Sequence, residues 1–186
     1  MNRRNHNPWL IVAFTGGLLY PPLVYFGITT LPSMTFVLIG LALIGVRLLA
    51  LRQQPDTKIW RIAFLIAALG LIVMLLLDSH LAVRAYPVVV SLSIAAIFGL
   101  SLLYPPTLVE RIARLKEPNL PPSGVIYTRR VTIIWAICLV ANALISAATA
   151  LWGTLAQWTL WNGLVSYILM GTLFIGEVMV RRMVRR

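Results

Sequence analysis

Apolar residues run along the chain in six long stretches, and short connections between the stretches hold most of the charged residues. A helix that crosses a bilayer needs about 20 mainly apolar residues, which is close to the length of each stretch. The pattern predicts an all-α fold, a polytopic membrane helix bundle that forms a single integral-membrane domain over residues 1–186. Its six transmembrane helices are predicted at about 9–29, 33–51, 60–77, 81–104, 131–152 and 158–180.

The first stretch contains a double proline, Pro21-Pro22. Proline lacks the backbone donor and clashes with the preceding turn, so it kinks or breaks a helix. A re-entrant hairpin is the alternative to a kinked span, but a hairpin would invert all later segments and move most basic residues to the outer side. We therefore expect the first span to be a Pro-kinked helix.

Composition and charge support this fold and give it an orientation. The chain is 60% hydrophobic and only 11% charged, whereas soluble domains carry about 25% charged residues. With the N-terminus inside, all of the 16 lysines and arginines except Arg84 fall on the inner side. Cytoplasmic loops are enriched in Lys and Arg, so the charges predict an N-in/C-in topology. They indicate orientation rather than nucleic-acid binding.

The one long connection, residues 105–130, is predicted to be cytoplasmic and to begin with a short amphipathic helix. Thr107 and Glu110 match a capping box, T-x-x-E, which marks the start of a helix. A helix with one apolar face and basic residues elsewhere lies on the inner membrane surface. The apolar face consists of Leu108, Val109, Ile112 and Leu115.

Three prolines follow this helix and predict an extended strap that leads to the fifth span. Clustered basic residues on the cytoplasmic side of a membrane bind anionic lipids or acidic partners. We expect the connection to bind a partner or lipid through five basic residues, Arg111, Arg114, Lys116, Arg129 and Arg130.

A few polar residues lie inside the predicted spans. Arg47 lies about one turn from the inner end of its span, so its guanidinium can extend to the headgroups. Glu177 precedes Arg181 by four residues, the spacing of an ion pair on a helix. Asn142 and Asn162 are expected to form hydrogen bonds between helices. These three roles are structural.

Four polar residues fall on the outer side, between the third and fourth predicted spans. We interpret them first as a polar turn, and the alternative is a cluster that binds a polar headgroup or assists proton transfer. Its members are Asp78, His80, Arg84 and Tyr86. Metal-binding spacings and nucleophile or nucleotide motifs do not occur, so we expect no metal, no cofactor and no catalytic residue.

The C-terminal part of the chain resembles an uncharacterised bacterial inner-membrane protein family. The resemblance rests on PPTLVERIARLKEPNLPP at 105–122, YTRR at 127–130 and WNG at 161–163. Members of that family are encoded beside aryl-polyene, xanthomonadin-like or other fatty-acid-type biosynthesis genes. The chain is also distantly similar to the septation protein A (YciB) family of inner-membrane-spanning proteins.

The resemblance implies the inner (cytoplasmic) membrane of a Gram-negative bacterium and a role near cell-envelope or lipid-pigment assembly. It also implies an acyl-carrier protein as an acidic partner. Some members are labelled ketosynthases, but a condensing enzyme needs a reactive cysteine with polar partners, and Cys138 lies in an apolar span without a histidine. We therefore expect no ketosynthase activity.

Three hypotheses for function follow. The first is a non-enzymatic inner-membrane accessory or scaffold protein that docks a cytoplasmic partner or anionic lipid through the 105–130 connection. The second is a lipid or polyene flippase or transporter with a groove beside the first span. The third is a membrane-embedded enzyme that acts on acyl or isoprenoid chains. Helix faces rich in Ala and Gly also permit a homo-oligomer.

Overall fold

The computed structural model describes residues 8–52, 58–77, 79–115 and 117–184, and over these residues the regular structure is entirely helical. The prediction of an all-α fold is therefore confirmed. The helices are α1 (Pro8–Gly27), α2 (Ser33–Arg52), α3 (Lys58–Leu77), α4 (Ser79–Leu103), α5 (Leu108–Arg114), α6 (Pro122–Leu151), α7 (Leu155–Leu160), the π-helix η1 (Trp161–Val165) and α8 (Ser166–Val184).

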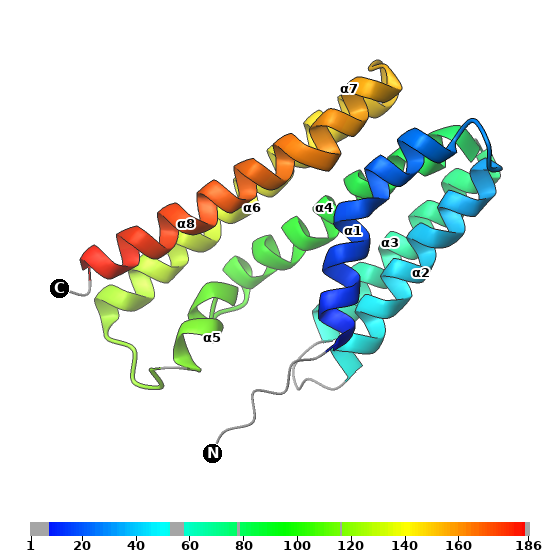
Figure 1. Cartoon of the computed structure of the whole chain (residues 1–186). Coiled ribbons are helices and arrows are strands. Elements are labelled where there is room, and N and C mark those ends of the chain that lie inside the picture. The colour runs from blue at the N-terminus through cyan, green and yellow to red at the C-terminus, as the bar shows by residue number, and fades with distance from the viewer. Residues whose placement is uncertain (1–7, 53–57, 78, 116, 185–186) are drawn as a thin grey trace.

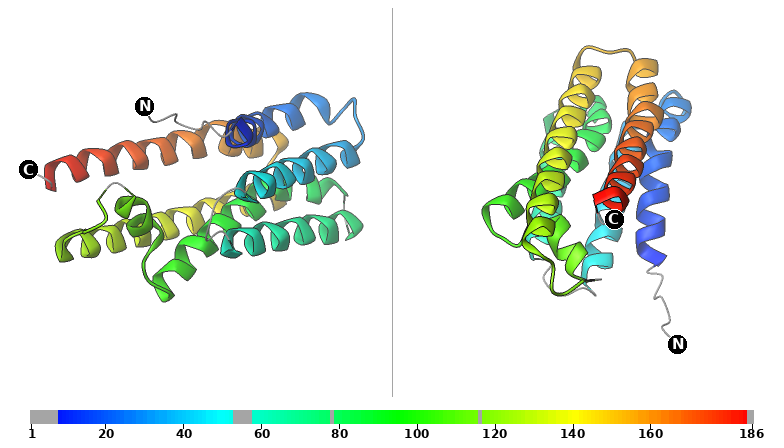
Figure 2. Two further views of the ribbon diagram at one scale, coloured as in Figure 1. Left: turned by 90° about the horizontal axis from the view of Figure 1, so that it is seen from below. Right: turned by 90° about the vertical axis from the view of Figure 1, so that its left-hand side faces the viewer.

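Helix α4 is the centre of the arrangement (Figure 1). It packs along α3 on one side and along α6 on the other, while α1 packs on α2 and crosses to α7 and η1. The short α5 lies against α6 and α4. Helix α8 extends from the end of η1 and runs beside α6, as both views in Figure 2 show.

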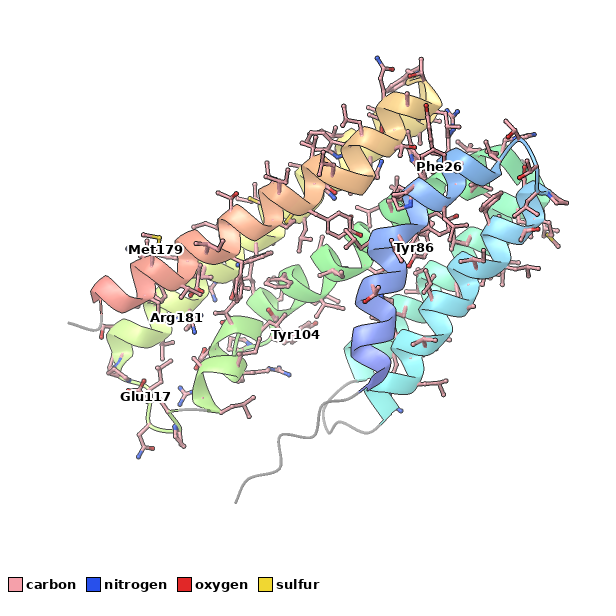
Figure 3. The ribbon with its side chains drawn as sticks, in the orientation of Figure 1. Phe26, Tyr86, Tyr104, Glu117, Met179 and Arg181 are labelled. Atoms are coloured by element: carbon pink, nitrogen blue, oxygen red, sulfur yellow. The ribbon has the colours of Figure 1, made fainter. Side chains whose placement is uncertain are left out.

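Several helices have the length and composition of membrane spans. Three regions of the described chain are long and apolar enough to cross a bilayer, His80–Leu103, Pro122–Leu151 and Leu155–Arg181. Two shorter apolar helices cover Ser33–Leu49 and Arg61–Val73. Large apolar side chains such as Phe26 and Met179 lie on the outside of the molecule (Figure 3). Such an exterior is favourable in lipid and a liability in water.

Helix α1 continues through Pro21-Pro22 and bends part-way along its length (Figure 1). The helix therefore spans Pro8–Gly27 without a hairpin, as expected for a kinked first segment. Tyr20 and Val24, on either side of the prolines, are fully buried. The Tyr20 hydroxyl donates to the Val83 carbonyl oxygen at 2.9 Å, which ties α1 to α4.

The long connection at 105–130 differs from the prediction, because α6 begins at Pro122 rather than near residue 131. Proline is well suited to the first helical position, where its missing N–H has no partner to lose. Arg129 and Arg130 therefore belong to α6, and the described residues 117–121 before it are not helical. The proline-rich strap is much shorter than the sequence pattern predicted.

Helix α5 forms where the capping motif predicted it. The Thr107 hydroxyl accepts from the Glu110 N–H at 3.4 Å and caps the helix. Ile112 and Leu115, which belong to the apolar face predicted to lie on the membrane, are exposed. Val109 of the same face is buried in the protein, together with Ala113 and with Glu110, which pairs with Arg114.

Candidate functional site

A cavity of about 210 Å³ lies in the interior, where α1, α2, α4, α6, η1 and α8 meet. We call it the polar chamber. Figure 3 shows one of its lining residues, Tyr86, inside the bundle. Polar groups inside a membrane bundle are costly and commonly mark functional sites. The polar side chains that line the chamber are Arg47, Tyr86, Ser91, Asn142, Asn162, Ser166 and Tyr167.

The two asparagines form one wall of the polar chamber. The Asn142 amide donates to the Ser91 hydroxyl at 3.0 Å and accepts from the Trp161 indole N–H at 3.2 Å. The Asn162 amide accepts from the Ser146 hydroxyl at 2.7 Å and donates to a main-chain carbonyl one turn earlier. These bonds connect α4, α6 and η1. Both amides have both a donor and an acceptor partner, so this wall is fixed by its own hydrogen bonds.

The π-helix η1 places Asn162 in this wall. A π-turn inserts an extra residue into a helix and is frequent at functional sites; here the Ser166 N–H donates to the Trp161 carbonyl. The next residue, Gly163, lets α1 approach closely, because a Cβ atom at Gly163 would lie 3.3 Å from Cδ of Pro22. The bend of α1 and the turn of η1 therefore fit against each other beside the chamber.

Arg47 brings a positive charge into the polar chamber. Its guanidinium carbon lies 5.9 Å from the ring centroids of both Phe64 and Tyr86. Its Nη2 atom lies so close to Gly17 that a Cβ atom there would approach it to 2.9 Å. The Tyr86 ring lies against Gly40 of α2. Gly40 precedes Arg47 by seven residues, which is about 10 Å along the helix.

The guanidinium therefore extends into the bundle, toward its middle. This direction differs from the expected extension of Arg47 to the headgroups. The physical reason is that helical side chains lean toward the N-terminal end of their helix, and for α2 that direction leads into the interior.

The charge of Arg47 lacks a counter-charge in the described part of the chamber. Its Nη1 atom is buried without a hydrogen-bond partner there, and so is the Tyr86 hydroxyl. No carboxylate belongs to the described lining. Arginine stays protonated in proteins, and burial of an unpaired charge costs several kcal/mol. Two aromatic rings near 6 Å offset only part of this, about 1–2 kcal/mol.

A second cavity, of about 950 Å³, separates α6 from α8 and is almost entirely apolar. We call it the α6–α8 groove. Its volume is at the upper end of the range of ligand sites, about 300–1,000 Å³. Trp135, Cys138 and Ile168 belong to its apolar walls. Its polar end carries Tyr127, Arg130 and Glu177.

The polar end of the groove bridges the two helices. The Tyr127 hydroxyl donates to the Glu177 carbonyl oxygen at 3.3 Å. The Glu177 carboxylate also accepts from the Arg181 Nε atom at 2.7 Å, in the ion pair that its spacing predicted. Arg130 makes no hydrogen bond or ion pair with any described residue, so its positive charge is left for a ligand.

Three of the basic residues predicted to bind a partner also bond to the chain itself. Arg111 Nε donates to the Pro106 carbonyl at 2.9 Å, and Arg114 pairs with the buried Glu110 carboxylate at 2.8 Å. Arg129 Nη1 donates to a carbonyl at the end of α4 at 3.3 Å. Lys116 lies outside the described residues.

The structure does not bring the predicted outer cluster together. Arg84 donates to the Gly153 carbonyl at 3.2 Å and so caps the end of α6. His80 lies 3.3 Å from a serine hydroxyl of α2, whereas the buried Tyr86 faces the polar chamber. Asp78 lies outside the described residues. Successive helical residues point about 100° apart, so neighbours in sequence diverge.

Comparison with known proteins adds nothing to this geometry. No family model, curated protein or solved structure matches the chain. Among the described residues, no group of three His, Cys, Asp or Glu side chains could hold a metal ion. Neither the polar chamber nor the groove was predicted from the sequence. The available signal for the chamber was Arg47, an arginine within a predicted span. Arg47 lines the chamber because its side chain extends into the bundle.

Proposed function

We propose that this chain is a non-enzymatic accessory protein of the bacterial inner membrane that binds one anionic lipid in the α6–α8 groove. In this proposal the chain has six spans, with both termini in the cytoplasm. The observation that carries the proposal is a long apolar cavity between two membrane-length helices, with basic and hydroxyl groups at one end. Epitope tags at the two termini, each expected to be accessible only from the cytoplasm, test the orientation.

The shape and polarity of the groove match an amphiphile. Its walls are apolar along α6 and α8, and its polar groups are gathered near the cytoplasmic end. Because hydrocarbon chains gain little by moving from lipid to an apolar groove, the headgroup decides the preference. Glu177 and Arg181 neutralise each other, and Arg130 leaves a net positive charge. An anionic headgroup is therefore the favoured ligand.

The same contacts favour a lipid over an acidic protein such as an acyl-carrier protein. A docking surface for such a protein needs several available basic side chains. Here Arg114 is neutralised by Glu110, and Arg111 and Arg129 each donate one N–H to a backbone carbonyl of the chain, while Arg130 lines the groove end. An arginine at the end of an apolar groove suits a single headgroup.

The lone cysteine provides a direct test, because Cys138 lies in the groove wall. The protein is reconstituted in nanodiscs of phosphatidylcholine with rising fractions of phosphatidylglycerol, and the rate of alkylation by N-ethylmaleimide is measured. We expect phosphatidylglycerol to slow alkylation of Cys138 in a saturable way. The matched control is Ile137→Cys in a Cys138→Ala chain, since Ile137 is exposed at the same depth but outside the groove. Equal effects on both cysteines would contradict the proposal.

A pair of neighbouring arginines tests the headgroup contact. One basic residue near an anionic membrane surface contributes about 1 kcal/mol, or roughly fivefold in lipid preference. Arg130→Gln is expected to reduce the protection of Cys138 by phosphatidylglycerol about fivefold. Arg129→Gln, one residue away but outside the groove, is expected to leave it unchanged. Equal effects of the two changes would remove the headgroup assignment.

A further inference from the structure

We propose that the polar chamber binds a small oxyanion, a carboxylate or a phosphate group, on the guanidinium of Arg47 and the hydroxyl of Tyr86. This site is separate from the α6–α8 groove and does not depend on the lipid proposed there. The chamber is lined by different residues and holds about 210 Å³ against about 950 Å³ for the groove. It therefore admits an anionic group with a few attached atoms, not a whole lipid.

The charge balance of the chamber calls for an anion. An arginine guanidinium is a permanent positive charge in proteins, and the described chamber lining has no acidic side chain. Of the three described carboxylates, Glu177 and Glu110 are paired with Arg181 and Arg114, and Glu117 lines a different cavity. A positive charge held in the interior without a partner is stabilised most by an anion that enters from outside the chain.

The hydrogen-bonding groups of the chamber select an acceptor ligand. Arg47 Nη1 and the Tyr86 hydroxyl are buried donors without a partner among the described residues. The amide groups of Asn142 and Asn162 already have partners on neighbouring helices. Carboxylate and phosphate oxygens match a guanidinium well and accept a hydroxyl proton at the same time.

Water is the alternative ligand for these donors, and it differs from an anion in one measurable respect. Water satisfies hydrogen bonds but leaves the charge of Arg47 uncompensated. If water alone fills the chamber, oxyanions do not raise the stability of the protein. If an oxyanion binds, stability rises with its concentration, because a ligand that binds only the folded state shifts the unfolding equilibrium.

The test is thermal unfolding of the full chain in neutral detergent, with sodium phosphate or sodium acetate titrated at constant ionic strength set by sodium chloride. We expect a saturable rise in Tm with phosphate or acetate that chloride does not give. To separate a free anion from a lipid-borne group, oleate is compared with acetate. A lipid source predicts saturation by oleate at a concentration at least tenfold lower, and a free anion predicts equal effects. Absence of a rise with all three oxyanions would overturn the proposal.

Variants assign the effect to the chamber. Tyr86→Phe keeps the buried ring, whose centroid lies 4.4 Å from that of Tyr20, and should raise the midpoint anion concentration at least tenfold. Arg47→Gln should abolish the anion effect and raise Tm in anion-free buffer, because it removes the unpaired charge. A merely structural Arg47 predicts the opposite sign, a lower Tm with the anion effect intact.

Two further arginines serve as controls. Arg84→Gln should lower Tm by removing the bonds at the end of α6 while keeping the full anion effect. Arg130→Gln should also keep the anion effect, which separates this site from the proposed lipid site. If Arg47→Gln does not fold, Tyr86→Phe decides: an unchanged midpoint for that variant refutes the proposal.

Discussion

The hydrogen bond between Asn142 and Ser91 makes a quantitative prediction about the stability of the bundle. Asn142 forms two bonds between helices, to Ser91 and from Trp161. Such bonds in membrane proteins contribute about 0.6 kcal/mol each on average and at most about 1.7. Asn142→Ala should therefore lower the free energy of unfolding by about 1–3 kcal/mol. The upper end of this range includes the cost of leaving the Trp161 indole N–H without a partner. Ser91→Ala should cost about 0.6 kcal/mol.

A double-mutant cycle measures the bond itself. The two single variants and the double variant are unfolded in mixed micelles with increasing dodecyl sulfate, and helix content is followed by circular dichroism. The coupling free energy is expected to be about 0.6 kcal/mol. Thr128→Val is the control partner for Asn142, because its hydroxyl bonds within α6 about 20 Å along the helix, and the two should be additive. Coupling below about 0.2 kcal/mol for Asn142 and Ser91 would refute the reasoning.

Three other changes have expected outcomes. Arg84→Gln removes bonds to the Ala150 carbonyl of α6 and to the Gly153 carbonyl just beyond it and should cost about 1 kcal/mol, detected as faster hydrogen exchange at the end of that helix. Gly163→Val places a branched side chain against Pro22; overpacking of about 1–3 kcal/mol should lower Tm by several degrees. Glu177→Gln frees the charge of Arg181, the ion-pair partner of a residue at the groove end, and should increase protection of Cys138 by phosphatidylglycerol about fivefold. No increase would mean that this charge does not face the lipid.

The helices themselves follow from the sequence, because long apolar runs can satisfy their backbone groups in lipid only by forming helices. The start of α6 was missed for a specific reason. Three prolines between Pro118 and Pro122 indicate an extended segment, yet the last one fits the first position of a helix. Sequence pattern alone does not tell which proline ends a loop and which begins a helix.

The candidate sites were harder to predict, because tertiary packing brings their residues together. The polar chamber combines Arg47 with Asn142, which lie on helices far apart in the chain, and its existence depends on the direction of one side chain. The groove depends on a separation between α6 and α8 that no local pattern encodes. The predicted outer cluster relied on proximity in sequence, and helical geometry disperses Arg84 and Tyr86 to different surroundings.

The α6–α8 groove has a consequence for how its occupancy must be measured. Because its walls belong to membrane-length helices, mobile hydrocarbon from the surrounding bilayer passes in and out of it whenever no specific ligand is held there. Binding is thus an exchange between two lipids, both present at the very high local concentration of a membrane. The meaningful quantity is a selectivity ratio at a stated lipid composition, and a dissociation constant measured in detergent describes a different competition.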